Sequence, residues 1–191
     1  MKEDVKMVIK TIQDNIFNTD AKHIAFAINT EGYNDFGFAG KVSDNYWPEI
    51  ANCGKHELGT VISKTVGDKT FHALVCHSLK YGWGDNQDEI IKMCFDTIDS
   101  NGEPIATVAI GTGLIGVTSG ANVPEIFCGM HESKQQIMLY SRFSLDFVID
   151  CYNSEKETRI VREDLVEETA AETLSTLPEK TMKKVLENKG K

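Results

Sequence analysis

The chain has 191 residues, with 20 Lys and Arg against 29 Asp and Glu and a formal net charge of -9. This length predicts one domain, with at most a small appendage, that buries most of its apolar surface. The negative charge argues against a nucleic-acid or anionic-membrane partner, because both attract positive protein surfaces. No apolar run approaches the ~20 residues of a membrane span, and the start Met-Lys-Glu-Asp-Val lacks the apolar stretch of a signal peptide, so we expect a soluble cytoplasmic protein.

The first segment predicts a helix, and the second predicts a strand. Apolar residues recur at helical spacing at Val5, Val8, Ile9, Ile12 and Ile16. A strand over Met7 to Ile12 is the alternative. The apolar run His23 to Ile28 follows the turn-like Asn-Thr-Asp and predicts a buried strand.

Glycines recur between residues 32 and 40, before a helix that we predict from Lys41 towards Ala51. The segment Asp35 to Gly40 reads Asp-Phe-Gly-Phe-Ala-Gly. Because glycine has no Cβ, the backbone of such a loop can approach a ligand closely. We therefore expect a first ligand loop here.

Two β-rich stretches, Thr60 to Ser63 and Thr70 to Ser78, predict a strand pair around a tight turn at Val66 to Lys69. The second stretch contains His77. A histidine in an apolar strand is more typical of a hydrogen-bonded core residue than of a catalyst. Spaced apolar residues from Ile90 to Ile98 then predict a helix ahead of an Asn-Gly turn.

The stretch Ile105 to Gly116, reading Ile-Ala-Thr-Val-Ala-Ile-Gly-Thr-Gly-Leu-Ile-Gly, predicts a buried strand that runs into a glycine-rich loop. Ser119 to Asn122 and Pro124 mark the start of the next helix. Backbone N–H groups in such a loop can hold a diphosphate. The alternative is a tight turn that serves packing alone.

The C-terminal part predicts one strand and a helical tail. Gln136 to Tyr140 predicts a strand, whereas Ser144 to Tyr152 fits either a strand or a helix. From Arg159 the composition is acidic and helical. We expect a domain over residues 1–155 and a helical extension over 156–191, packed on the domain or on a partner, which offers a route to a homo-oligomer.

The five cysteines predict free thiols rather than a disulfide framework. Two Cys-x-x-His pairs, Cys53 with His56 and Cys128 with His131, could together form a zinc site. Such spacings also arise by chance, and we expect no metal and no cofactor.

Several of these motifs together resemble the macrodomain family. Residues 24–29, Ile-Ala-Phe-Ala-Ile-Asn, resemble the strand end Ile-Val-Asn-Ala-Ala-Asn of that family, and residues 37–42 resemble the glycine loop that follows it. Residues 75–78, Val-Cys-His-Ser, are similar to its Val-Ile-His-Thr strand. Residues 109–116 closely resemble its second ligand loop, so the match runs in order from His23 to Ser141.

The resemblance implies a three-layer α/β/α fold with a mixed sheet, and it implies binding of ADP-ribose or a related NAD metabolite. Asn29 would contact the distal ribose, the second loop would hold the diphosphate, and Phe143 would stack on adenine or else pack in the core. The family also uses an acidic residue for the adenine amine, for which Asp14, Asn15 and Asp20 all remain open. The implied ligand contacts are Asn29, Gly37, Phe38, Ala39, Gly40, Gly111, Thr112, Gly113, Leu114, Ile115, Gly116 and Phe143.

The departures from the family pattern concern catalysis. Phe26 stands at the first asparagine of the family motif, and Asp35-Phe36-Gly37 stands where hydrolytic members have three glycines. Ile115 stands at the catalytic aspartate of another hydrolytic branch, and it can neither accept a proton nor attack a sugar. The catalytic residues are therefore unknown, with Asp35 and Lys41 as polar candidates or as solvated charges. ADP-ribosyl hydrolase and non-catalytic interaction protein are the alternatives to a binding module.

Overall fold

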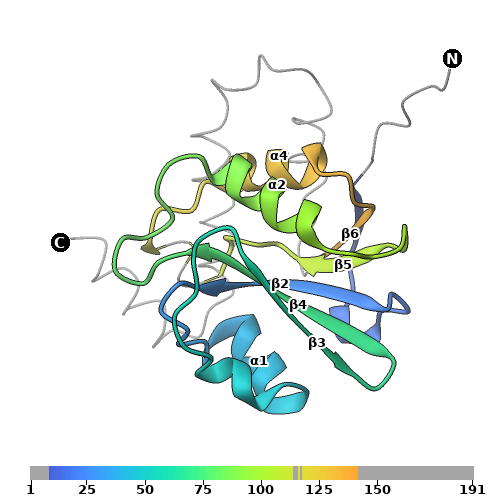
Figure 1. The fold of residues 1–191 in the computed structure, drawn as a ribbon. Helices are drawn as coiled ribbons and strands as arrows, with labels where there is room; N and C mark the ends of the chain where they lie inside the picture. Colours follow the sequence, from blue (N-terminus) through green and yellow to red (C-terminus); the bar gives the residue numbers. More distant parts are fainter. Residues whose placement is uncertain (1–8, 114–115, 117, 142–191) are drawn as a thin grey trace, which may run out of the picture.

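The computed structural model describes residues 9–113, 116 and 118–141 (Figure 1). Within them, six strands form one sheet in the order β1-β6-β5-β2-β4-β3. The strands are β1 (Lys10–Ile12), β2 (His23–Asn29), β3 (Val61–Val66), β4 (Lys69–His77), β5 (Ile105–Val108) and β6 (Ile137–Tyr140). The helices are α1 (Gly37–Asn45), α2 (Gln87–Thr97) and α4 (Val123–Glu132), with short 3-10 helices η1 (Ile16–Asn18) and η2 (Pro48–Ala51).

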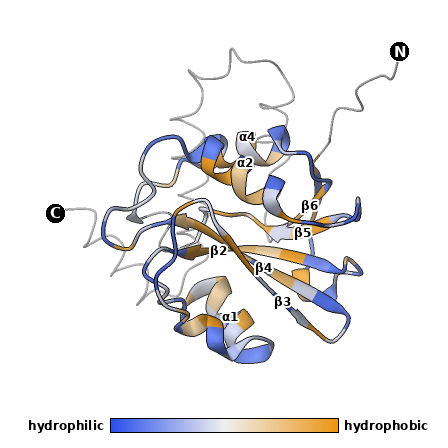
Figure 2. Ribbon diagram, in the orientation of Figure 1, coloured by the Kyte–Doolittle hydropathy of each residue, from blue (hydrophilic) through white to orange (hydrophobic). Residues whose placement is uncertain are grey.

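The expected three-layer α/β/α architecture is confirmed. Helix α1 lies on one face of the sheet, and α2 and α4 lie together on the other (Figure 1). The sheet is mixed because β3 pairs with β4 in the antiparallel direction, while the other neighbouring strands are parallel. A sheet covered on both faces requires strands that are apolar on both faces. Strands β2 and β4 meet this requirement, as their hydropathy shows (Figure 2).

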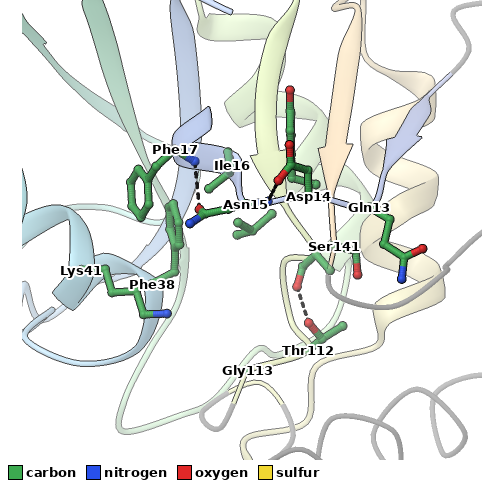
Figure 3. A pocket seen from close by; sticks show the side chains of 13 residues that line it. Gln13, Asp14, Asn15, Ile16, Phe17, Phe38, Lys41, Thr112, Gly113 and Ser141 are labelled. Carbon is green, nitrogen blue, oxygen red and sulfur yellow. Dashed lines mark hydrogen bonds between the residues drawn. The ribbon is translucent and has the colours of Figure 1, made fainter. Parts of the chain in front are cut away.

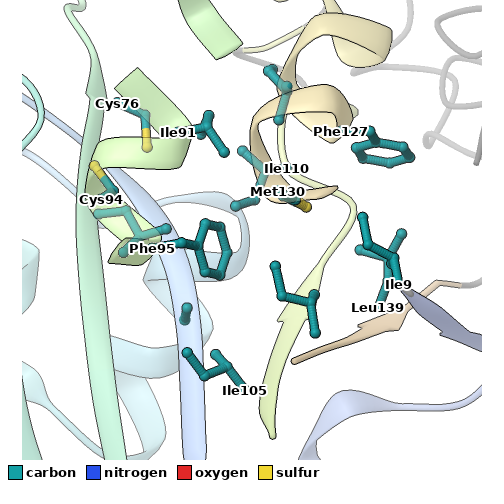
Figure 4. Close-up of a cluster of buried hydrophobic side chains, with 14 of the residues drawn as sticks. Ile9, Cys76, Ile91, Cys94, Phe95, Ile105, Ile110, Phe127, Met130 and Leu139 are labelled. Atoms are coloured by element: carbon teal, nitrogen blue, oxygen red, sulfur yellow. The ribbon is translucent and has the colours of Figure 1, made fainter. Parts of the chain in front are cut away.

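Two apolar cores hold the layers together. Ile24 and Phe26 of β2 point toward α1, whereas Ala25 between them points toward α2 and α4. The α2 and α4 side contains Phe95 and Phe127, both fully buried (Figure 4). Burial of one such side chain stabilises the fold by roughly 1.5–3 kcal/mol.

Close contact between α2 and α4 depends on one glycine. A Cβ at Gly129 would lie 2.3 Å from the backbone oxygen of Asp88. Glycine removes that clash, so the two helix backbones can approach each other. The N-terminus of α4 matches the sequence prediction, because Asn122 Oδ1 accepts a hydrogen bond from Glu125 N at 3.1 Å and Pro124 occupies the first turn.

Two predicted elements differ from the structure. The predicted N-terminal helix is wrong at Lys10–Ile12, which form strand β1 beside β6 as the alternative proposed. The pairing is tertiary and leaves no local trace in the sequence. Helix α1 begins at Gly37 rather than Lys41, so Gly37 to Gly40 are a helical turn and not a loop. Gly40 allows this turn, because a Cβ there would lie 2.9 Å from the carbonyl carbon of Asp35.

The remaining predicted elements agree with the structure or lie outside it. The strand at His23, the strand pair around residue 67, the helix ending near Ile98 and the strand ending at Tyr140 are confirmed. The region Ser144 to Tyr152, the tail from Arg159 and the extension over 156–191 lie outside the described residues. Among the helices of residues 9–141 that the structure describes, none has the length and apolarity to cross a membrane.

Candidate functional site

A pocket of roughly 700 Å³ opens where several parallel strands end (Figure 3). Since β1, β5 and β6 are parallel, the segments that follow them lie at the same edge of the sheet. This carboxyl edge is where open α/β sheets generally bind ligands. The lining residues are Gln13, Asp14, Asn15, Ile16, Phe17, Phe38, Lys41, Val108, Ala109, Thr112, Gly113, Tyr140 and Ser141.

One wall of the pocket is a pair of parallel aromatic rings. The rings of Phe17 and Phe38 have centroids 5.4 Å apart and planes 14° apart. Phe17 also contacts Tyr46, at 5.3 Å between centroids, and Phe38 contacts the buried Phe26 edge-on. These contacts fix both rings of the wall. A fixed aromatic wall suits a planar, apolar or heteroaromatic group of a ligand.

The acidic part of the pocket comes from the segment between β1 and η1. Asp14 Oδ1 accepts hydrogen bonds from Asn15 N at 2.6 Å and Asn18 Nδ2 at 3.2 Å. Asn15 Oδ1 accepts from Phe17 N at 3.1 Å and so caps η1. Both contacts to Asp14 use the same oxygen, so among the described residues Oδ2 remains available to a donor on a ligand.

The glycine loop after β5 forms the floor of the pocket. Gly111 has φ +87°, and a Cβ there would meet Ile126 Cδ1 at 2.6 Å. Thr112 Oγ1 donates to Ala109 O at 2.6 Å and fixes the start of the turn. Gly113 lines the pocket, and a Cβ there would meet no atom of the described residues within 4 Å, apart from its chain neighbours. Gly113 therefore faces open space rather than the protein.

Among the described residues that line the pocket, Asp14 and Lys41 are charged. Lys41 lies on α1 beside Phe38, and its amine extends into the pocket (Figure 3). Ser141 and Thr112 point toward one another across the glycine loop. The pocket thus offers a carboxylate, an amine, an aromatic wall and an open glycine backbone.

The residues implied by the resemblance divide into three groups. Phe38, Thr112 and Gly113 line the pocket. Leu114, Ile115 and Phe143 lie outside the described residues. The structure does not bring the other six to the pocket lining, namely Asn29, Gly37, Ala39, Gly40, Gly111 and Gly116.

Asn29 serves the turn that follows β2. Its Nδ2 donates to Tyr33 O at 2.6 Å and to Asn34 Oδ1 at 3.0 Å. Its Oδ1 accepts from Gly32 N at 2.8 Å and Tyr33 N at 3.1 Å. All four hydrogen-bonding positions of the side-chain amide are occupied, so contact with a ribose would require this turn to change.

Among the candidates for an adenine contact, Asp14 and Asn15 line the pocket and Asp20 does not. The polar candidate Lys41 lines it as well, whereas Asp35 does not. The sequence reasoning missed Gln13, Phe17, Tyr140 and Ser141. The signal that could have found Gln13, Tyr140 and Ser141 is position, because each ends or directly follows a predicted or possible strand; no such signal marks Phe17.

A second polar cluster lies at the end of β4. Ser78 Oγ donates to Glu31 Oε1 at 2.6 Å and Leu79 N donates to Oε2 at 2.8 Å. Partial burial opposes ionisation of Glu31, but these hydrogen bonds outweigh it and lower its pKa to about 2. Burial lowers the pKa of His77 to about 4 despite the charge of Glu31.

His77 is a buried core residue that stacks on Trp83, with ring centroids 4.9 Å apart. Among the described residues its ring nitrogens have no hydrogen-bond partner, so the expected hydrogen-bonded core histidine is confirmed as buried but not as hydrogen-bonded.

The Cys-x-x-His pairs do not form a metal site in the part of the chain that the structure describes. No cluster of three or more His, Cys, Asp or Glu side chains suited to a metal occurs there. His56 Nε2 lies 3.3 Å from the backbone oxygen of Cys53, and Cys53 Sγ lies 3.7 Å from Asn34 Nδ2. Cys53, Cys76 and Cys94 are free thiols, as the sequence predicted.

Comparison with known proteins gives structural neighbours only. No family model and no curated protein sequence matches the chain. The macrodomain of Mycobacterium tuberculosis DarG is similar with a TM-score of 0.55 and 11% identity, over 70% of this chain and 97% of that one. Thermosipho africanus DarTG in complex with ADP-ribose is similar with a TM-score of 0.51 and 12% identity, over 71% of this chain and 41% of that one.

A third neighbour, alphavirus P23pro-zbd, is similar with a TM-score of 0.51 and 12% identity over 87% of this chain. This chain spans 23% of the alphavirus structure and nearly all of the M. tuberculosis macrodomain. At these identities the likeness shows the fold, which is that of macrodomains.

Proposed function

We propose that this chain, which has the macrodomain fold, binds ADP-ribose or a related NAD-derived nucleotide in the pocket at the carboxyl edge of its sheet. The observation that carries the proposal is the open face of Gly113 opposite the aromatic wall of Phe17 and Phe38. One structural neighbour is described as a complex with ADP-ribose, which supports this choice of ligand.

The pocket chemistry suits the parts of such a nucleotide. An adenine ring packs against the Phe17 wall while Asp14 Oδ2 accepts from its amino group. Phosphate oxygens approach the backbone at Thr112 and Gly113, where no side chain blocks them. Lys41 adds a positive charge from the opposite wall, beside Phe38. The cavity of roughly 700 Å³ lies within the range of about 300–1,000 Å³ that is usual for small-molecule sites.

Calorimetric titration with ADP-ribose, ADP and NAD tests the proposal. We expect binding, and we expect Gly113→Val to abolish it, because a side chain at residue 113 meets no protein atom and projects into the pocket. Lys41→Ala is the matched comparison at the opposite wall. It should weaken binding less than Gly113→Val if backbone groups provide most of the phosphate contacts.

Folding is checked by circular dichroism and thermal unfolding of each variant. Folded Gly113→Val that binds ADP-ribose as tightly as the parent would refute the assignment of the glycine loop. Absence of binding for all three nucleotides would refute the nucleotide site itself. Incubation of the chain with ADP-ribosylated protein separates binding from hydrolysis.

A further inference from the structure

A chain of four polar side chains crosses the sheet at the end opposite the pocket. Ser63 Oγ lies 2.7 Å from His72 Nδ1, and His72 Nε2 lies 2.9 Å from His23 Nδ1. His23 Nε2 lies 3.6 Å from Glu103 Oε2. The chain links β3, β4, β2 and the turn before β5, because Ser63 pairs with His72 across strands and His23 begins β2.

The two imidazoles meet head-on through their nitrogens. Their planes differ by 18°, and their centroids are 5.2 Å apart. That separation is about the 2.9 Å nitrogen contact plus the two ring radii, so both nitrogens lie on the line between the centroids. If the two rings were stacked face to face, these nitrogens would not lie on the line between the ring centroids. The contact is a straight N–H to N hydrogen bond, which requires one hydrogen between the rings.

Glu103 gives the chain a direction. Glu103 Oε2 lies 3.6 Å from His23 Nε2, which is beyond hydrogen-bond length, so its negative charge favours a hydrogen on that nitrogen without bonding to it. When both histidines are neutral, His72 Nε2–H donates to His23 Nδ1, and Ser63 O–H donates to His72 Nδ1. When one proton is added, His23 becomes the donor to His72, and His72 Nδ1–H donates to Ser63 Oγ. The serine hydroxyl serves both states because it can donate or accept.

We propose that Ser63, His72, His23 and Glu103 form a proton-limited clamp, which accepts one proton and rejects a second, and so holds three strands and the turn before β5 together at neutral pH and releases them in acid. A second proton would place a hydrogen on each of the two facing nitrogens at 2.9 Å. Two positive rings in that position repel each other. The clamp therefore opens when both histidines are protonated.

The charged groups around the clamp are consistent with one protonated histidine rather than two. Lys22 Nζ lies 3.5 Å from Glu103 Oε1, so Glu103 serves a lysine and a histidine together. On β3, Lys64 is paired with Glu49 at 2.8 Å. On α2, which packs on β4, Lys92 is paired with Asp96. No further carboxylate is paired with His72 among the described residues.

Acid should weaken the clamp through His72. Burial and the charge of His23 lower the pKa of His72 from 6.5 to about 4. Between pH 4 and pH 6.5, His72 is therefore protonated in the unfolded protein but neutral in the folded protein. Stability conferred by the clamp is present above pH 6.5 and is lost as the pH falls toward 4.

Histidine side-chain NMR of the full chain from pH 8 to pH 4.5 tests the proposal. We expect one of the two histidines to titrate and His72 to remain neutral while the protein is folded. In His23→Gln, an amide oxygen can accept from a charged His72, so the titration midpoint of His72 should rise. His56→Gln, at a histidine outside the clamp, is the matched control and should leave both resonances unchanged.

Proton uptake on unfolding gives a second readout. His72→Gln should reduce the uptake measured between pH 5 and pH 6 by about one proton. If His23→Gln fails to fold, His23→Asn replaces it and should likewise raise the titration midpoint of His72. Independent titration of both histidines in the folded parent would overturn the proposal. An unchanged His72 midpoint in folded His23→Gln would show that burial alone acts on His72.

Discussion

A Cβ at Gly116 would lie 2.0 Å from the backbone oxygen of Gly111, so the two ends of the glycine loop touch. The loop after β5 thus closes on itself before α4 begins, and Ala121 N donates to Gly116 O at 3.1 Å. A Cβ at Gly113, between these ends, would meet none of the described residues apart from its chain neighbours. Glycine therefore has two roles in one loop: closure at Gly111 and Gly116, and open access at Gly113.

Gly116→Ala should destabilise the protein, whereas Gly113→Ala should not. The added methyl group at residue 116 meets backbone, which cannot move without opening the loop, and such overpacking costs about 1–3 kcal/mol. Urea unfolding of both variants measures the difference. Equal midpoints for the two variants would contradict the described closure of the loop.

Phe17→Leu should weaken nucleotide binding more than it weakens folding. Stacking of a base on an aromatic side chain contributes about 1–3 kcal/mol by substitution. Tyr46→Leu is the matched control, because Tyr46 contacts the ring of Phe17 without lining the pocket. Calorimetry with ADP-ribose should show a large loss for Phe17→Leu and a small loss for Tyr46→Leu. The reverse order would place the base elsewhere.

His77 should make the protein less stable in mild acid. Its pKa is about 4 in the folded chain and 6.5 in the absence of burial, so the unfolded state binds more protons between these values. Stability is retained above pH 6.5 and is lost as the pH falls, by on the order of 2 kcal/mol at pH 5. His77→Gln should lower the pH dependence of urea unfolding. A slope equal to that of the parent would refute this assignment.

Glu31→Ala should loosen the turn after β4. The carboxylate accepts from Ser78 Oγ and from Leu79 N, and their loss costs about 1 kcal/mol at such a partly exposed site. The stabilisation by Glu31 is present above pH 4.5 and is lost as the pH falls toward 2. Hydrogen exchange at Leu79 N measures the effect, with Glu57→Ala as an exposed control. Unchanged protection at Leu79 would contradict it.

The sequence predicts the central strands well because they are long apolar runs between turn signals. His23–Asn29 and Ile105–Val108 are of this kind. It fails at Lys10–Ile12, whose three residues become a strand only by pairing with β6. It also fails at Gly37 to Gly40, where two glycines suggest a loop but the turn is helical. Glycine content alone does not distinguish these structures.

Pocket residues that belong to a sequence motif could be predicted. Pocket residues that are distant in sequence, and that only the folded sheet brings together, could not. Gly113 and Phe38 belong to motifs and do line the pocket. Phe17 and Tyr140 lie far apart in the chain and reach the pocket through the order of the strands. The side-chain amide of Asn29 has all its hydrogen bonds to the turn that follows β2. These bonds depend on atomic geometry, which a motif does not encode.

The pairing of β1 with β6 has a consequence for synthesis of the chain. Strand β1 precedes the other five described strands in the sequence, yet within the sheet its partner is β6, which begins at Ile137. During translation β1 must wait unpaired until β6 has left the ribosome, while β2 to β5 can already associate. Phe17 and Tyr140 take their places in the pocket only at that late step, so a nascent chain that stops before Ile137 should be unable to retain the nucleotide.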